Sequence, residues 1–217
     1  RMNGFEVGYS LRQDPAKTAT KNASLNSVGI NWTDKKYYVG LAQETHNDYF
    51  AFSGTASTAA AGSVYNAAAG LRSKDTGTRL SFSYRDKGVR IGADTSTLKF
   101  TETSTQVNGF KQHKFNTWQV TGEYDVASNF TVAAQYANNG AGTCELNGPI
   151  SCSTVGLGGN LVGFGAKYTL DRNFALFALV AKGSANSGAV ISLGSGAGRT
   201  AIGGTINAVA VGIQARF

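Results

Sequence analysis

The charged residues of this chain recur at alternating positions in short segments that otherwise hold apolar, hydroxyl or glycine residues. Side chains alternate between the two faces of a β-strand, so these charges are predicted to share one face. Charges repeated along a face produce a field that attracts counter-ions, which is a different chemistry from a fixed catalytic centre. The predicted set comprises Arg12, Arg79, Arg85, Arg90, Lys167 and Arg216 with Glu6, Glu44, Asp94 and Glu123.

Other residue types give weaker signals for chemistry. His46 and Asp48 open one long polar segment and His113 lies near another, and an acid and a histidine within hydrogen-bond distance could transfer protons. The chain has only two histidines, which is weak evidence for a catalytic site. The segment 194–200 looks like a phosphate loop but lacks its lysine and a following helix. We therefore expect no enzyme activity, no catalytic residue, no metal site and no cofactor.

The two cysteines, Cys144 and Cys152, lie close together in a glycine-rich segment. No histidine or second cysteine pair is near them, which favours a disulfide that closes a loop over a metal site. The alternative is a pair of free surface thiols. A disulfide would indicate an oxidising compartment.

The composition favours a β-protein. Hydrophobic residues make up 41% of the 217 positions, and 28 glycines, 9 tyrosines and 12 phenylalanines accompany only 2 prolines. The longest apolar run, residues 174–181, is far shorter than the roughly 20 residues of a transmembrane helix. Any contact with a membrane would therefore be made by strands. The net charge of +7 is spread over alternating positions, which excludes a compact nucleic-acid patch.

Alternating apolar and polar positions predict about ten strands joined by connections that are short and long in turn. The short turns lie at 33–36, 86–88, 125–129 and 171–173, and the long loops at 13–23, 46–77, 104–113, 139–160 and 184–204. Short turns at one end and long loops at the other are typical of a membrane barrel. The strands are predicted at 4–12, 24–33, 36–45, 78–85, 89–100, 114–124, 130–138, 161–170, 173–182 and 205–217.

Strand alternation alone does not separate a soluble sandwich from a membrane barrel. Aromatic residues near the strand ends, among them Trp32, Tyr84, Trp118 and Tyr168, favour the barrel, because aromatic girdles mark the two membrane interfaces. The terminal Phe217 fits the same girdle. We therefore predict an all-β fold, an antiparallel transmembrane β-barrel.

In such a barrel the polar side chains surround a column of water. The predicted charges are mostly basic, so their field would give a mild preference for anions. Arg79, Arg85 and Arg90 are the best candidates, since they lie on the two strands joined by the turn at 86–88. The alternative is that these charges pair with carboxylates of the same face, or with lipopolysaccharide phosphates at the rim, and set no selectivity.

Several phrases resemble the general porins of Gram-negative bacteria, particularly the beta-proteobacterial type: RMNGFEVGYSL, GEYDVASNFTVAAQYAN, AKYTLDRNFALFALVAKG and the ending VGIQARF. The resemblance implies an outer-membrane barrel of about sixteen strands that forms homotrimers and passes small hydrophilic solutes and anions by diffusion. It also implies contact with outer-membrane lipid and lipopolysaccharide. Phe217 would be the signal that the outer-membrane assembly machinery reads.

Porins of this type are roughly half as long again as the chain, so we expect residues 1–217 to form a single domain that is the C-terminal portion of a porin. The first strands and the loop that narrows the pore would then lie outside it. The competing interpretation is a closed ten-stranded barrel, which could act as a surface protease or as an adhesin that presents its loops.

Overall fold

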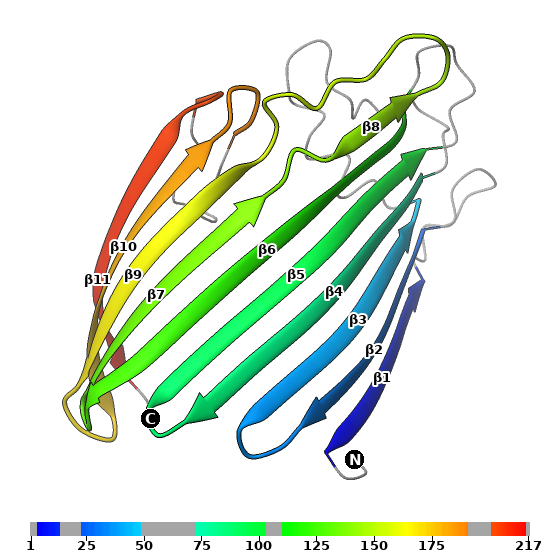
Figure 1. Ribbon diagram of the computed structural model, residues 1–217. Helices are drawn as coiled ribbons and strands as arrows, with labels where there is room; N and C mark the ends of the chain where they lie inside the picture. The colour runs from blue at the N-terminus through cyan, green and yellow to red at the C-terminus, as the bar shows by residue number, and fades with distance from the viewer. Residues whose placement is uncertain (1–3, 14–22, 49–72, 103–109, 191–200, 216–217) are drawn as a thin grey trace.

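The computed structural model describes residues 4–13, 23–48, 73–102, 110–190 and 201–215, which form a single antiparallel sheet of eleven strands (Figure 1). In these ranges no helix is long and apolar enough to cross a membrane. The strands are β1 (Phe5–Gln13), β2 (Ser24–Thr33), β3 (Tyr37–Asn47), β4 (Ser73–Asp86), β5 (Val89–Glu102), β6 (Phe110–Ala127), β7 (Phe130–Asn139), β8 (Thr143–Leu146), β9 (Gly159–Thr169), β10 (Phe174–Ala185) and β11 (Thr205–Ala215).

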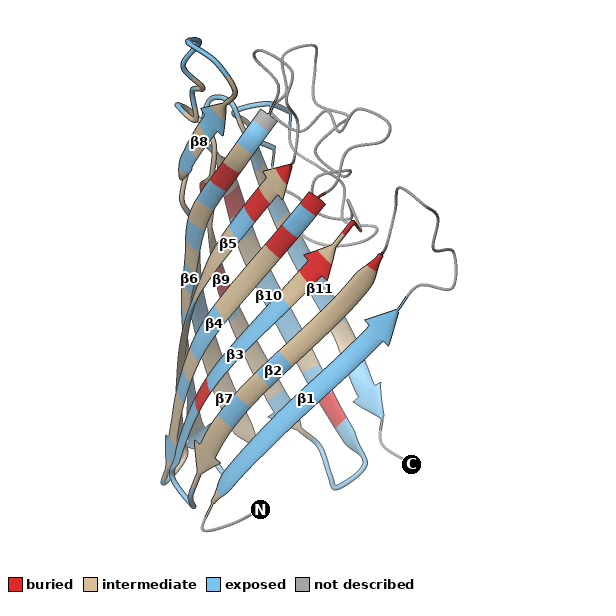
Figure 2. Ribbon diagram, turned by 90° about the vertical axis from the view of Figure 1, so that its right-hand side faces the viewer, coloured by how far each residue is buried: buried red, intermediate tan, exposed pale blue. Residues whose placement is uncertain are grey.

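The sheet is a meander in which each strand pairs with the next, except that β7 pairs with β9 and the short β8 pairs with β6. The sheet curls until β9, β10 and β11 lie across from β2, β3 and β4 (Figure 2). Within the described part of the chain, no pairing joins β1 to β11, so the sheet stays open along that line. The all-β antiparallel prediction is confirmed.

Several strands are longer than predicted, and one was missed. β4 begins at Ser73 instead of residue 78, and β6 begins at Phe110 instead of residue 114, so parts of the predicted loops 46–77 and 104–113 are strand. The predicted loop 139–160 contains β8. The reason is common to all three corrections: beyond the lipid the outward face of a strand carries polar residues as the inward face does, so the apolar alternation that marks a strand disappears.

The tight turns lie at one end of the sheet, together with the start of β1 and the end of β11, whereas β8 and the long connections lie at the other (Figure 1). We call these the turn end and the loop end. Asp34 organises the β2–β3 turn by accepting hydrogen bonds from the backbone N–H groups of Lys36 and Tyr37, both at 2.6 Å. The bonds from Tyr37 and Lys36 lower the pKa of Asp34. Asp171 accepts the same pair of bonds from Asn173 and Phe174 at 2.7 and 2.9 Å.

The β4–β5 hairpin closes with two residues, Lys87 and Gly88, that both have positive φ angles, 44° and 82°. This is the signature of a type I′ turn, whose twist matches that of the strands. In Gly88→Ala the alanine would have to adopt the left-handed backbone conformation. Its Cβ would also lie 3.1 Å from Cβ of Asp125. We expect a loss of about 1–2 kcal/mol in the free energy of unfolding, measured by urea titration in lipid vesicles.

The matched control is Lys87→Asn. Asparagine adopts positive φ more readily than lysine, so this change should leave the unfolding midpoint unchanged or raise it slightly. A Gly88→Ala protein as stable as the parent would contradict the assigned turn.

The register divides the side chains into an apolar face and a polar face. Along the apolar face Phe5 lies opposite Trp32, Trp32 opposite Val39 and Val39 opposite Phe82. Aromatic rings gather near the turn end, where the rings of Tyr37 and Tyr84 are 5.2 Å apart. Large residues of this face are exposed, with Val209 and Val211 at 76% of their full accessible surface.

A soluble sandwich would bury these side chains, and the described residues contain almost no apolar core. Among the described residues only Ala23, Phe100 and Ala175 are both apolar and buried. Most buried positions of β3 to β6 lie toward the loop end (Figure 2). A sheet that exposes its apolar side in this way must be covered by lipid.

Candidate functional site

Nine of the ten charged residues predicted to share a face do share one. On this polar face Glu6 lies opposite Asn31, and Asp94 lies opposite Ser81 on one side and Gln119 on the other. Arg216 and Phe217 lie outside the described residues. That the polar face lines a pore stays a prediction. The nine are Glu6, Arg12, Glu44, Arg79, Arg85, Arg90, Asp94, Glu123 and Lys167.

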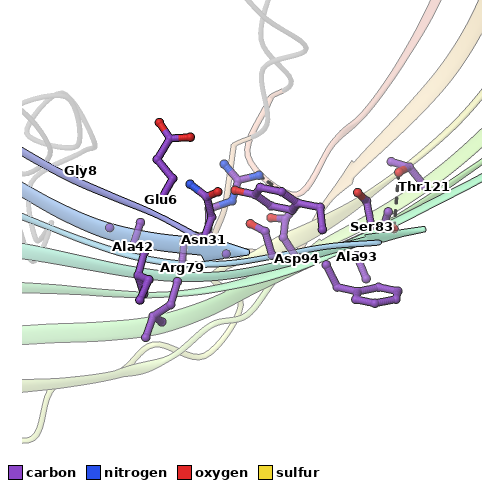
Figure 3. A pocket seen from close by; sticks show the side chains of 17 residues that line it. Glu6, Gly8, Asn31, Ala42, Arg79, Ser83, Ala93, Asp94 and Thr121 are labelled. Atoms are coloured by element: carbon purple, nitrogen blue, oxygen red, sulfur yellow. Dashed lines mark hydrogen bonds and ion pairs between the residues drawn. The ribbon is translucent and has the colours of Figure 1, made fainter. Parts of the chain in front are cut away.

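A hollow of about 540 Å³ opens over the polar face of β1 to β6. Small residues such as Gly8, Gly29 and Ala42 line it, so side chains leave room for water there. Figure 3 shows Glu6, Ser83 and Thr121 on the same side of the ribbons as this hollow. The polar face is therefore the concave, water-accessible side of the sheet.

Arg79 and Asp94, which both line this hollow, form an ion pair. The Arg79 Nη2 atom lies 3.0 Å from Asp94 Oδ2, and Gln119 donates a hydrogen bond of 2.6 Å to the same oxygen. The Arg79 side chain keeps 56% of its surface exposed, whereas that of Asp94 keeps 18%. The guanidinium therefore faces the water and the carboxylate lies behind it.

A second group of charges lies near the turn end. Arg90 donates hydrogen bonds to Glu123 at 2.6 Å and to both oxygens of Asp125 at 2.7 and 3.2 Å. Thr131 also donates to Asp125, at 2.7 Å. Arg85 lies directly opposite Arg90 and forms no ion pair within the described residues. Two carboxylates thus neutralise the charge of Arg90, whereas the exposed Arg85 keeps an unpaired positive charge.

Toward the loop end, several side chains of the polar face are buried. His46 bonds to the Glu44 carboxylate and lies opposite Asp75 in the register. Asp75 and Glu102 are 4% and 7% exposed, and their carboxylate oxygens have no hydrogen-bond partner. Burial of this kind removes the two acids from the water-accessible surface, whereas Glu44 of the same face is exposed.

The sequence prediction missed three acids of the polar face: Asp75, Glu102 and Asp125. Asp125 was assigned to a turn, because the register shift between Asp125 and Ala127 interrupts the alternation of β6. Asp75 and Glu102 were placed outside the strands. Residues an even number of positions apart along a strand lie on the same face. This rule could have identified both acids, because Asp75 is an even number of residues from Arg79 and Glu102 an even number from Asp94.

A second hollow of about 460 Å³ follows the polar face across β7, β9, β10 and β11. Its lining includes Lys167 together with Phe177 and Leu179. A Cβ added at Gly212 would lie 2.6 Å from the Phe177 ring, and one at Gly165 would lie 2.7 Å from Leu179. Phe177 and Leu179 thus pack over the glycines of the two neighbouring strands, where no side chain covers the backbone. This explains why β10 is apolar on both faces.

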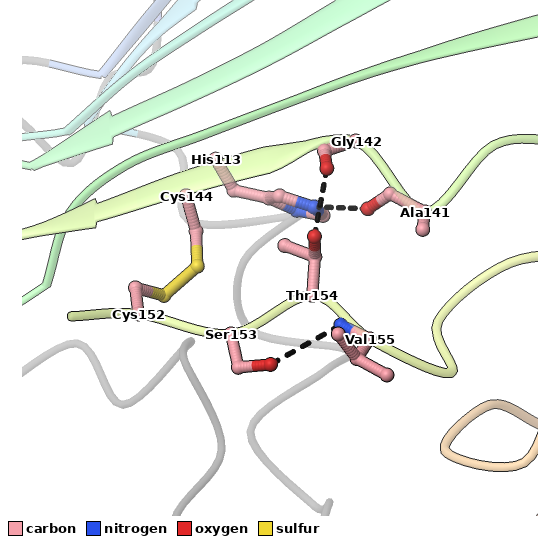
Figure 4. Close-up of a disulfide and its surroundings, with 8 residues drawn as sticks. All are labelled: His113, Ala141, Gly142, Cys144, Cys152, Ser153, Thr154 and Val155. Atoms are coloured by element: carbon pink, nitrogen blue, oxygen red, sulfur yellow. Dashed lines mark hydrogen bonds between the residues drawn. A yellow bond between two sulfur atoms is a disulfide. The ribbon is translucent and has the colours of Figure 1, made fainter.

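The predicted disulfide is present between Cys144 and Cys152, so neither thiol is free. Cys144 lies on β8, next to His113 of β6, and His113 bonds to the Ala141 carbonyl (Figure 4). Thr154 donates a hydrogen bond of 2.7 Å to the Gly142 carbonyl. The bridge therefore fastens the β7–β9 connection, which joins the main ladder through the pairing of β8 with β6.

Replacing both cysteines with serine should leave the strand signal in circular dichroism unchanged, because β8 contributes only four of the strand residues. Hydrogen exchange should become faster within 141–157, since the loop is no longer closed. The amides of β9 and β10 provide the internal control. A loss of protection in those strands would show that the bridge supports the sheet.

The residues considered for hydrolysis lie at the loop end. His46, Asp48 and His113 are 8%, 1% and 4% exposed, so all three are buried. The segment 194–200 lies outside the described residues. In the described ranges, no group of three or more His, Cys, Asp or Glu side chains could hold a metal ion.

Of the comparisons with known proteins, only the one with solved structures found a similarity. The chain matches no family model and no curated protein. It is similar to the solved structure of outer-membrane expressed OmpT of Vibrio cholerae, with a TM-score of 0.59 and 14% identity over 85% of this chain and 52% of that one. A FadL homologue of Pseudomonas aeruginosa has a TM-score of 0.45 and 11% identity, over 97% of this chain and 59% of that one.

The chain thus spans about half the length of the solved structures to which it is similar. Its fold is that of the bacterial outer-membrane β-barrels. The outer-membrane location predicted from the sequence agrees with this fold and with the exposed apolar face.

Proposed function

We propose that this chain forms the wall of a porin-type channel for the passive diffusion of small hydrophilic solutes and ions. The observation that carries the proposal is the concave polar face: charged side chains and small residues surround a hollow there, while the opposite face is apolar and exposed. A column of water on one side and lipid on the other is the arrangement of a conducting barrel.

The pairing of charges supports a mild preference for anions. Arg79 and Arg90 are offset by Asp94, Glu123 and Asp125. In the described part of the polar face, Arg12, Arg85 and Lys167 form no ion pair, whereas the acids Asp75 and Glu102 are buried. The exposed acids Glu6 and Glu44 lie on the same face, so the proposed preference for anions depends on the three unpaired bases outnumbering these two acids.

The open line between β1 and β11 supports the proposal that further strands complete the barrel. Unpaired strand edges are not tolerated in lipid, because their backbone groups would have no hydrogen-bond partners. The chain is then the C-terminal portion of a beta-proteobacterial type of porin that assembles into homotrimers, and Phe217 is read by the assembly machinery. The mass of the protein extracted from its native membrane tests it. A mass matching residues 1–217 alone would favour closure of β1 on β11.

Single-channel recording in planar lipid bilayers tests the function itself. We expect stable conductance steps and a reversal potential in a KCl gradient that is biased toward chloride. A folded protein that conducts nothing would contradict the proposal and favour an adhesin. Cleavage of peptides by a protein that does not conduct would instead favour a surface protease using the buried acids and histidines of the loop end.

A further inference from the structure

Two large apolar side chains of β10, Phe177 and Leu179, lie on the polar face, and we call them the apolar platform. In the register Phe177 lies opposite Lys167 of β9 and Gly212 of β11, and Leu179 lies opposite Gly165 of β9. Packing over the glycines uses one side of the platform, and the other side faces the hollow of about 460 Å³. Leu179 stays 47% exposed there. Apolar surface that meets water in a hollow favours the binding of an apolar group.

The hollow above the platform has room for a small organic molecule. Its volume of about 460 Å³ lies within the range of small-molecule sites. A hollow of about 250 Å³ adjoins it and shares Glu123, Ala133, Gly165 and Leu179 with it. Because small residues flank the platform on β9 and β11, a planar ring can reach it from the hollow.

One cation borders the platform. Lys167 lines the same hollow and lies directly opposite Phe177, at the strand spacing of about 4.8 Å. Within the described ranges, Lys167 forms no ion pair. The acid next along this row of the register, Asp125, is two strands away, and its two oxygens accept hydrogen bonds from Arg90. Arg90 also donates to Glu123, the acid that lines the hollow. The charge left for a solute on the platform is therefore that of Lys167.

We propose that the apolar platform and Lys167 form a subsite for small monocarboxylates that carry an aromatic ring. The ring packs on Phe177 and Leu179, and the carboxylate accepts a charge-assisted hydrogen bond from the Lys167 ammonium group. The inference deepens the proposed function, on which it rests for the orientation of the polar face toward water. Binding at the subsite does not itself require conduction.

The test is a calorimetric titration of the full chain, folded in zwitterionic detergent, with 3-phenylpropionate as the probe. Propionate lacks the ring, and 2-phenylethylamine carries an ammonium group in place of the carboxylate. We expect both to bind about tenfold more weakly or worse than 3-phenylpropionate, because each keeps only one of the two contacts. Equal affinity for propionate or for the amine would overturn the inference.

Leu179→Ser removes half of the platform, and we expect the apparent Kd for 3-phenylpropionate to rise about fivefold or more. The matched control is Leu98→Ser. Leu98 of β5 also lies on the polar face and packs over the glycine opposite it, Gly77, but it lines a different hollow. Its loss should leave the Kd close to that of the parent. Far-ultraviolet circular dichroism checks that both variants keep their strands, and equal weakening in the two would contradict the subsite.

The charge is tested by Lys167→Gln, which should raise the Kd about fivefold, whereas Lys167→Arg should bind as the parent does. Lys182→Gln is the control, because Lys182 is an exposed lysine of β10 on the opposite face. A Lys167→Gln protein that binds like the parent would refute the assignment. Conductance is recorded separately. A channel that conducts normally but binds 3-phenylpropionate and propionate alike refutes the subsite alone, and ring-dependent binding by a protein that does not conduct refutes the channel alone.

Discussion

The protein with Arg79→Glu and Arg85→Glu is expected to prefer cations. Each reversal changes the charge of the polar face by two units, and Arg79→Glu also removes the cationic partner of Asp94. A unit charge 4 Å from an ion contributes about 1 kcal/mol in water, so we expect the anion-to-cation permeability ratio to fall about fivefold or more. The reversal potential in a tenfold KCl gradient measures it.

The control for this experiment is Lys35→Glu with Lys87→Glu. It makes the same change in net charge at exposed turn positions outside the polar face, and should leave the reversal potential close to that of the parent. The effect of the arginine variant should shrink in 1 M salt, where the Debye length is about 3 Å. An unchanged reversal potential at low salt would mean that these side chains do not face the permeating ions.

The second large effect is expected from Val211→Arg. Val211 lies on the apolar face of β11, between Val209 and Ile213, and is 76% exposed in the chain alone. An arginine at the lipid-facing midplane of a barrel costs about 2–4 kcal/mol. We expect that loss in the free energy of unfolding in phosphatidylcholine vesicles, measured by urea titration.

Ala210→Arg is the matched control, because Ala210 is the preceding residue of the same strand and lies on the polar face opposite Leu179. An arginine there can reach water, so we expect a much smaller loss of stability. The opposite ranking of the two variants would show that the apolar face is the interior of a soluble fold.

Strand direction and facing follow from the sequence where one side of a strand meets lipid. β1 and β11 alternate so regularly that Val7 and Val211 can be assigned to the apolar face without a structure. The alternation fails once both sides of a strand carry polar residues. For that reason the start of β4 at Ser73 and the whole of β8 escaped prediction.

The contacts within the candidate site were beyond the sequence for a different reason. Which residue lies opposite which depends on turn geometry and on bulges, and a slip of one residue exchanges the faces. The Arg79–Asp94 pair and the opposed Lys167 and Phe177 are consequences of register. The sequence could predict the face of Arg90, but not that Glu123 and Asp125 hold it.

β6 has 18 residues, although about 9–11 residues suffice for a strand to cross a bilayer. The surplus carries β8, so the bond between Cys144 and Cys152 stands well clear of the lipid. Long connections of outer-membrane barrels point away from the cell. A reductant coupled to a bulky polymer and added to intact bacteria would therefore reach this bond without ever entering the periplasm.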